Sequence, residues 1–127
     1  MKILNFKEEF YMAKKRMFSN ELIDTDKFLE MPLSTQCLYF HFGMKADDDG
    51  FVANPKKVIR GSGCSNEDLE KLRENGYIHI FESGVVVIID WLVNNTIRCD
   101  RYSPTRYLEE KSRITVSESK SYIISRN

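Results

Sequence analysis

The fold of this chain is decided by residues 33–91, LSTQCLYFHFGMKADDDGFVANPKKVIRGSGCSNEDLEKLRENGYIHIFESGVVVIIDW, which run from Leu33 to Trp91. Apolar residues recur at three- and four-residue spacing after Ser34, which predicts an apolar helix capped by that serine. An acidic turn follows at residues 47–50, and a short strand at Phe51-Val52 comes after it.

Two more helices and two strands complete this stretch. Asn54-Pro55 predicts the start of a basic helix, because asparagine caps helices and proline suits their first position. Glycines at 61 and 63 end that helix, and the capping sequence from Ser65 to Asp68 begins another. Residues 77–81 and 85–89 are β-rich runs joined by a short turn at 82–84, which is typical of a hairpin. We therefore expect an α+β fold of the winged helix-turn-helix type, in the order helix, strand, helix, helix, β-hairpin.

The length of 127 residues and the apolar content of 42% suit one domain with a modest core. We expect an N-terminal arm at residues 1–18, the winged-helix domain at 19–95, a basic and aromatic extension at 96–113, and a polar tail or linker at 114–127. Residues 1–11 have two interpretations. They are either translated sequence ahead of a native start at Met12, or an amphipathic leader that packs on the domain.

Composition excludes several classes of protein. Three cysteines far apart, with only two histidines, argue against a disulfide framework and against a structural zinc site. No apolar run approaches the roughly 20 residues that span a bilayer, and a signal peptide is not evident, so we expect a cytoplasmic protein without a membrane partner. We also expect no catalytic residues, no metal and no cofactor, because no nucleophile motif or phosphate-binding loop is found.

The acidic run invites a calcium interpretation, which its spacing rejects. An EF-hand loop needs oxygen ligands at its first and twelfth positions and glycine at its sixth. Placing Gly50 sixth puts Lys45 first and Lys56 last, and both are cations. We therefore expect a solvated turn.

The charge pattern points to DNA binding through a particular helix. Lysine plus arginine equals aspartate plus glutamate, 19 each, so any attraction to nucleic acid must be local. The helix after Ser65 carries Lys71 and Arg73 against four acidic residues, which makes base reading by this helix the weaker expectation. The preceding helix carries three cations within residues 51–66, a stretch without any acid. The residues that we expect at a DNA interface are Lys14, Lys15, Arg16, Lys56, Lys57, Arg60, Lys71, Arg73, Arg98, Arg101, Tyr102 and Arg106.

Arginines alternate with tyrosines in residues 98–107. This alternation suits phosphate contact combined with base stacking. A mobile polar tail is the alternative interpretation of the same residues.

Several short motifs in order resemble a known family. They are MAKKRMFS from Met12, MPLSTQ from Met31, YFHF from Tyr39, ADDDGFV from Ala46, NPKK from Asn54, FESGVVVI from Phe81 and IRCDRY from Ile97. Together they resemble the amino-terminal domain of phage and prophage replisome organisers, the DnaD-like replication initiators of low-GC Gram-positive bacteria. The resemblance covers residues 12–111.

This resemblance implies a winged-helix domain that helps to assemble a replication complex on origin DNA. The partners that we expect are DNA, double-stranded rather than single-stranded, and a second copy of the chain in a homo-oligomer. Contact with the helicase loader would require a carboxy-terminal region that these 127 residues do not contain. Two alternatives stay open: a winged-helix module for protein interaction or oligomerisation in replication, and a phage transcriptional regulator.

Overall fold

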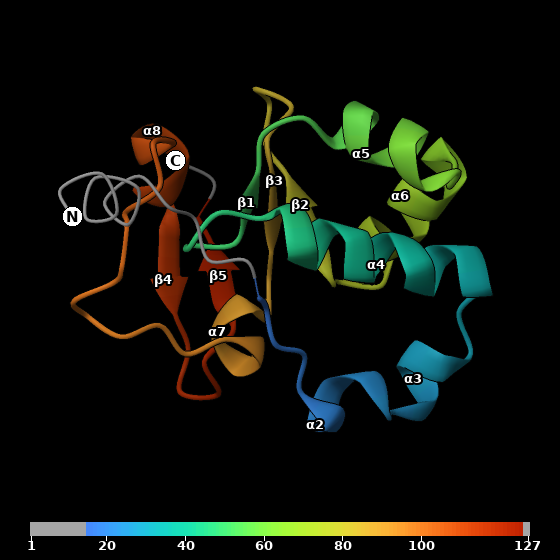
Figure 1. Ribbon diagram of the computed structural model, residues 1–127, viewed down its shortest axis with the longest axis horizontal. Helices are drawn as coiled ribbons and strands as arrows, with labels where there is room; N and C mark the ends of the chain where they lie inside the picture. Colours follow the sequence, from blue (N-terminus) through green and yellow to red (C-terminus); the bar gives the residue numbers. More distant parts are fainter. Residues whose placement is uncertain (1–14, 126–127) are drawn as a thin grey trace, which may run out of the picture.

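The computed structural model describes residues 15–125, which form a mixed α+β fold with two small antiparallel sheets. The mixed α+β class expected from the sequence is confirmed. Figure 1 labels the elements, which in chain order are α2 (Asn20–Ile23), α3 (Asp26–Leu29), α4 (Leu33–Lys45), β1 (Phe51–Val52), α5 (Pro55–Ser62), α6 (Asn66–Glu74), β2 (Ile78–Ile80), β3 (Val86–Ile88), α7 (Trp91–Asn94), α8 (Leu108–Lys111), β4 (Ile114–Val116) and β5 (Tyr122–Ile124).

The larger sheet has the order β1-β3-β2, and both pairings are antiparallel. Val87 lies opposite Phe51 on one side and opposite His79 on the other. All three residues of β3 are buried, which explains why this strand is apolar on both faces. Gly84 closes the β2–β3 turn with φ of +91°, a conformation that glycine adopts without strain.

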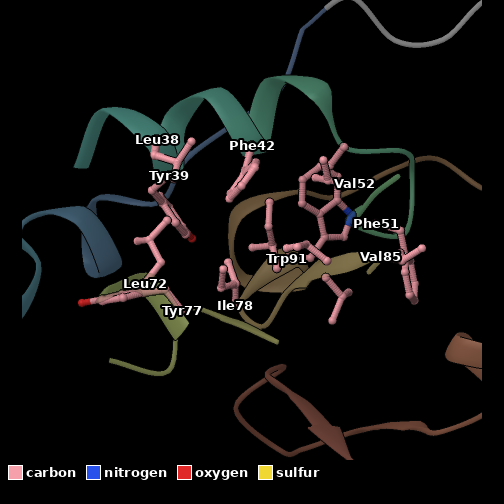
Figure 2. Close-up of a cluster of buried hydrophobic side chains, with 14 of the residues drawn as sticks. Leu38, Tyr39, Phe42, Phe51, Val52, Leu72, Tyr77, Ile78, Val85 and Trp91 are labelled. Carbon is pink, nitrogen blue, oxygen red and sulfur yellow. The ribbon is translucent and has the colours of Figure 1, made fainter. Parts of the chain in front are cut away.

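Helix α4 packs against α5 and α6 and supplies much of the core. Its residues Leu38, Tyr39 and Phe42 are fully buried. Figure 2 shows them below α4, on the side that faces Leu72, Tyr77 and Ile78. The ring of Phe18 packs against Phe40 with centroids 4.9 Å apart. A Cβ atom at Gly43 would collide with the Phe18 ring, so this packing favours glycine in the middle of the helix.

The ends of α5 and α6 follow the expected capping signals. The Asn54 side chain accepts a hydrogen bond from the backbone N–H of Lys57, and Gly63 ends α5 with φ of +80°. Ser65 and Asp68 form a reciprocal capping box at the start of α6. The expected cap at Ser34 is wrong, because α4 begins at Leu33 with Pro32 before it. The hydroxyl of Ser34 instead donates to the Asp68 carboxylate at 2.8 Å, which ties α4 to α6.

The segments expected to flank the domain pack onto it. Residues 114–124, expected to be part of a polar tail or linker, form the β4–β5 hairpin. This hairpin docks through Tyr122, which is 8% exposed and whose backbone N–H donates to the Ile89 carbonyl at 2.8 Å. At the other end, Asn94 and Asn95 accept hydrogen bonds from the backbone N–H groups of Ser19 and Met17. Hydrogen bonds therefore cross both predicted domain boundaries: Met17 to Asn95 crosses the one at residue 18, and Tyr122 to Ile89 crosses the one at residue 95.

Candidate nucleic-acid interface

The exposed face of α5 carries the cations that the sequence singled out. Lys56, Lys57 and Arg60 are exposed, whereas Ile59 on the opposite face is buried. Lys56 and Arg60 lie one helical turn apart on the same face, because side chains four residues apart align along a helix. None of the three forms an ion pair with another residue of the described chain. Their charges are therefore open to solvent.

Helix α6 presents a different surface, because its cations are paired with its own glutamates. The ammonium group of Lys71 lies 3.2 Å from Glu67, and the guanidinium of Arg73 lies 2.6 Å from Glu70. Pairs of this kind, three or four residues apart on an exposed helix, are weak, but they neutralise the cations locally. Within residues 15–125, no cation from outside α6 forms an ion pair with its carboxylates.

The β2–β3 turn is already in contact with the C-terminal part of the chain. The Ser83 hydroxyl donates to the Glu110 carboxylate at 2.7 Å, and the Arg113 guanidinium lies 5.6 Å from the centroid of the Phe81 ring. A shallow pocket of about 170 Å³ here is lined by Phe81, Glu82, Ser83, Glu109, Glu110 and Arg113. Three carboxylates in one small pocket repel phosphate, so this turn is a poor surface for nucleic acid.

The acidic turn at residues 47–49 is a packing centre, and its expected solvation is wrong. Asp49 is 8% exposed. Its carboxylate accepts from the Tyr102 hydroxyl at 2.7 Å, from the backbone N–H of Thr105 at 2.8 Å and from the Lys111 ammonium at 3.3 Å. Each of these partners lies more than 50 positions after Asp49 in the sequence. No local sequence signal could have indicated them.

The neighbouring aspartates hold the turn in the same way. Asp47 accepts from the Thr105 hydroxyl and from the backbone N–H groups of Asp49 and Phe51. Burial raises the pKa of the Asp47 carboxyl, and these hydrogen bonds partly offset that rise. Asp48 accepts from the backbone N–H of Ser103 at 3.0 Å. The extension after residue 96 is thereby fastened to the turn that precedes β1.

Two predicted DNA contacts belong to this packing centre. The Arg16 side chain is 2% exposed and lies 3.0 Å from the Asp48 carboxylate, where it also donates to the Ala46 carbonyl at 2.9 Å. The expectation that Arg16 contacts phosphate is therefore wrong for this structure, because the guanidinium is buried and paired. The Tyr102 hydroxyl is bound by Asp49 and Lys111, and the Lys111 ammonium lies 5.4 Å from the ring centroid. Tyr102 is placed to anchor the extension rather than to stack on bases.

The remaining predicted contacts in the described chain are exposed, and those between α7 and α8 lie away from α5. Lys15, Arg101 and Arg106 are exposed, and Arg98 forms an exposed ion pair with Asp100 at 3.1 Å. Figure 1 shows α5 and α6 on one side of the larger sheet and the segment between α7 and α8 on the other. The structure therefore does not bring all the predicted cations into one patch. Lys14 lies outside the described residues.

Comparisons with family models, with curated proteins and with solved structures find no match.

In residues 15–125, no three side chains of histidine, cysteine, aspartate or glutamate are arranged to hold a metal ion. No helix in the described part of the chain has the length and apolar content needed to cross a membrane.

Proposed function

We propose that this chain is a DNA-binding winged-helix domain of a phage-type replication initiation or replisome organiser protein. The order α4-β1-α5-α6-β2-β3 and the sheet order β1-β3-β2 support the winged-helix assignment. The motifs that resemble replisome organisers support the place in replication. DNA is the partner in this proposal, and it is held mainly through its phosphates.

One observation carries the proposal: the solvent-exposed cations of α5 have no acidic neighbour in the sequence and no ion-pair partner in the described chain. Unpaired cations on a rigid helix attract phosphate, and binding releases the counterions that DNA condenses. The paired cations of α6 and the carboxylates at the β2–β3 turn make those two elements secondary. Lys71 and Arg73 therefore contribute less than Lys56, Lys57 and Arg60.

Duplex DNA suits this surface better than single strands. Single-strand binders combine cations with aromatic rings that stack on the bases. Tyr102 is the one large aromatic residue that is exposed within residues 15–125, and its hydroxyl is bound by Asp49 and Lys111. Contact with the regularly spaced phosphates of a duplex needs no such stacking.

The test is the salt dependence of binding to a labelled duplex, measured by fluorescence anisotropy for the wild type and for a Lys56→Ala/Lys57→Ala/Arg60→Ala variant. Each lost phosphate contact lowers the slope of log K against log salt by about 0.9, so the variant should lose up to roughly 2.7 units of slope. A Lys27→Ala/Lys45→Ala/Lys120→Ala variant changes the net charge equally and should bind nearly as well as the wild type. Equal binding by the wild type and the α5 variant would refute the proposed interface.

A second candidate function is a module for self-association or partner binding. The observation that favours it is the outward-facing acidic surface of α6, where Glu67, Glu70 and Glu74 are all exposed. Light scattering at increasing protein concentration discriminates between the two. A mass that rises with concentration, together with no duplex binding at low salt, would favour this second function.

A further inference from the structure

Two cysteines that are far apart in the sequence meet where α4 packs against the turn between α5 and α6. The thiol of Cys64, in that turn, donates to the backbone carbonyl of Ser34 at 3.3 Å. Cys37 lies one helical turn beyond Ser34 in α4. The side chains of positions i and i+3 share a helix face, so the Cys37 thiol lies on the side of α4 that Cys64 contacts.

Hydrogen bonds hold this contact in place. The Asp68 carboxylate at the start of α6 accepts from the hydroxyls of Ser34 and Thr35, each at 2.8 Å. The first turn of α4 is thereby fixed against the segment that carries Cys64. Both cysteines are partly exposed, so a small reagent can reach them.

The two thiols also interact electrostatically. Burial raises the pKa of the Cys37 thiol, and both the charge of Cys64 and a hydrogen bond to it raise this pKa further. The hydrogen bond between the two thiols places their sulfur atoms in contact, as an exchange reaction between them requires.

We propose that Cys37 and Cys64 are a site of reversible oxidation, at which a low-molecular-weight disulfide converts the two thiols into one intramolecular disulfide. The Cys64 thiolate attacks one sulfur of the small disulfide, which forms a mixed disulfide and releases one small thiolate. The Cys37 thiolate then attacks the Cys64 sulfur and releases the second small thiolate. Two electrons pass from the cysteines to the reagent, and the released thiolates take up the two protons that the cysteines lose.

The disulfide would fasten the turn between α5 and α6 to α4. It would close a loop from residue 37 to residue 64, and closing a loop of this length restricts the unfolded chain. Oxidised protein should therefore melt at a higher temperature than reduced protein, by about 5–10 °C for a domain of this size. Reduction with dithiothreitol should reverse the shift.

The test uses the full chain with Cys99→Ser, so that the exposed third thiol does not react. After incubation with glutathione disulfide, intact mass spectrometry should show the loss of two hydrogens, and peptide mapping should place the link between Cys37 and Cys64. The link should form about tenfold faster in native protein than in urea-unfolded protein, because the fold brings the thiols together.

Cys37→Ser and Cys64→Ser variants in the same background are the matched controls, and each should stop at a mixed disulfide. Mixed disulfides on both cysteines of the native chain, without a link between them, would overturn the proposal. A link that forms no faster in the native chain than in urea would overturn it as well. Neither result depends on whether the chain binds DNA.

Discussion

At the scale of single residues, charge alone does not tell which side chains face solvent. The three aspartates before Gly50 look like a solvated turn, but each accepts hydrogen bonds from distant residues. Arg16 looks like a phosphate contact, but it is buried beside Asp48 and lies 5.2 Å from the centroid of the Trp91 ring. In both cases the partner is remote in sequence, so the local pattern carries no information about the pairing.

Replacement of Arg16 by alanine should therefore destabilise the protein without a direct effect on DNA contact. Removing one member of a buried ion pair leaves the other charge uncompensated, which typically costs about 3–5 kcal/mol. Urea unfolding followed by circular dichroism measures the loss. Lys15→Ala is the matched control, because Lys15 is exposed and should change the free energy of unfolding by less than about 0.5 kcal/mol. An Arg16→Ala variant as stable as the Lys15→Ala variant would contradict the structural role of Arg16.

At the scale of elements, the sequence predicts the central helices and strands well, because their signals are local. The caps at Asn54 and Ser65 and the apolar runs of β2 and β3 each lie within a few residues of the element they define. Prediction from the sequence fails where a side chain could serve either of two structural roles. Ser34 looks like a helix cap, but its hydroxyl bonds to Asp68 of another helix. The β4–β5 hairpin is not predicted, because the polar residues 117–121 suggest a tail, although five of the six residues in its two strands are apolar.

The bonds to Asp68 make a pH-dependent prediction at this scale. Burial raises the pKa of the Asp68 carboxyl, but hydrogen bonds from Ser65, Ser34 and Thr35 outweigh burial, so the pKa lies below the ordinary 3.8. A lowered pKa in the folded state stabilises the protein above the unfolded pKa, and this contribution is lost as the pH falls through the folded pKa.

Asp68→Asn should accordingly reduce the free energy of unfolding by about 2 kcal/mol near pH 7, since charged hydrogen bonds are replaced by neutral ones. The difference between wild type and variant should shrink as the pH falls below about 4. Urea unfolding at a series of pH values measures this difference. Asp24→Asn, at an exposed position, should show little difference at any pH. If the difference in the free energy of unfolding between wild type and Asp68→Asn stayed constant down to about pH 2, the Asp68 carboxylate would be excluded as its source.

At the scale of the whole molecule, the N-terminal and C-terminal segments complete the fold. The acidic turn before β1 gains its partners from residues 102–111, and the hairpin beyond them bonds to the end of β3. The Tyr122 hydroxyl donates to the Asp49 carbonyl at 2.9 Å, and the Ser121 hydroxyl donates to the Asp90 carboxylate at 2.6 Å. The hairpin, the acidic turn and the central sheet therefore form a single packed unit.

Deletion of residues 114–127 tests this unit directly. A solvated tail could be removed with a change below about 0.5 kcal/mol. The structure instead leads us to expect a loss of about 3 kcal/mol or more, because the deletion removes a buried tyrosine side chain and its hydrogen bonds to Ile89 and Asp49. Tyr122→Phe keeps the ring and removes only the hydroxyl, so it should cost about 1 kcal/mol. Urea unfolding orders the three proteins, and we expect stability to fall from wild type to Tyr122→Phe to the deletion. A deletion as stable as the wild type would mean that the hairpin contributes nothing to the fold, and the acidic turn would then hold its shape without it.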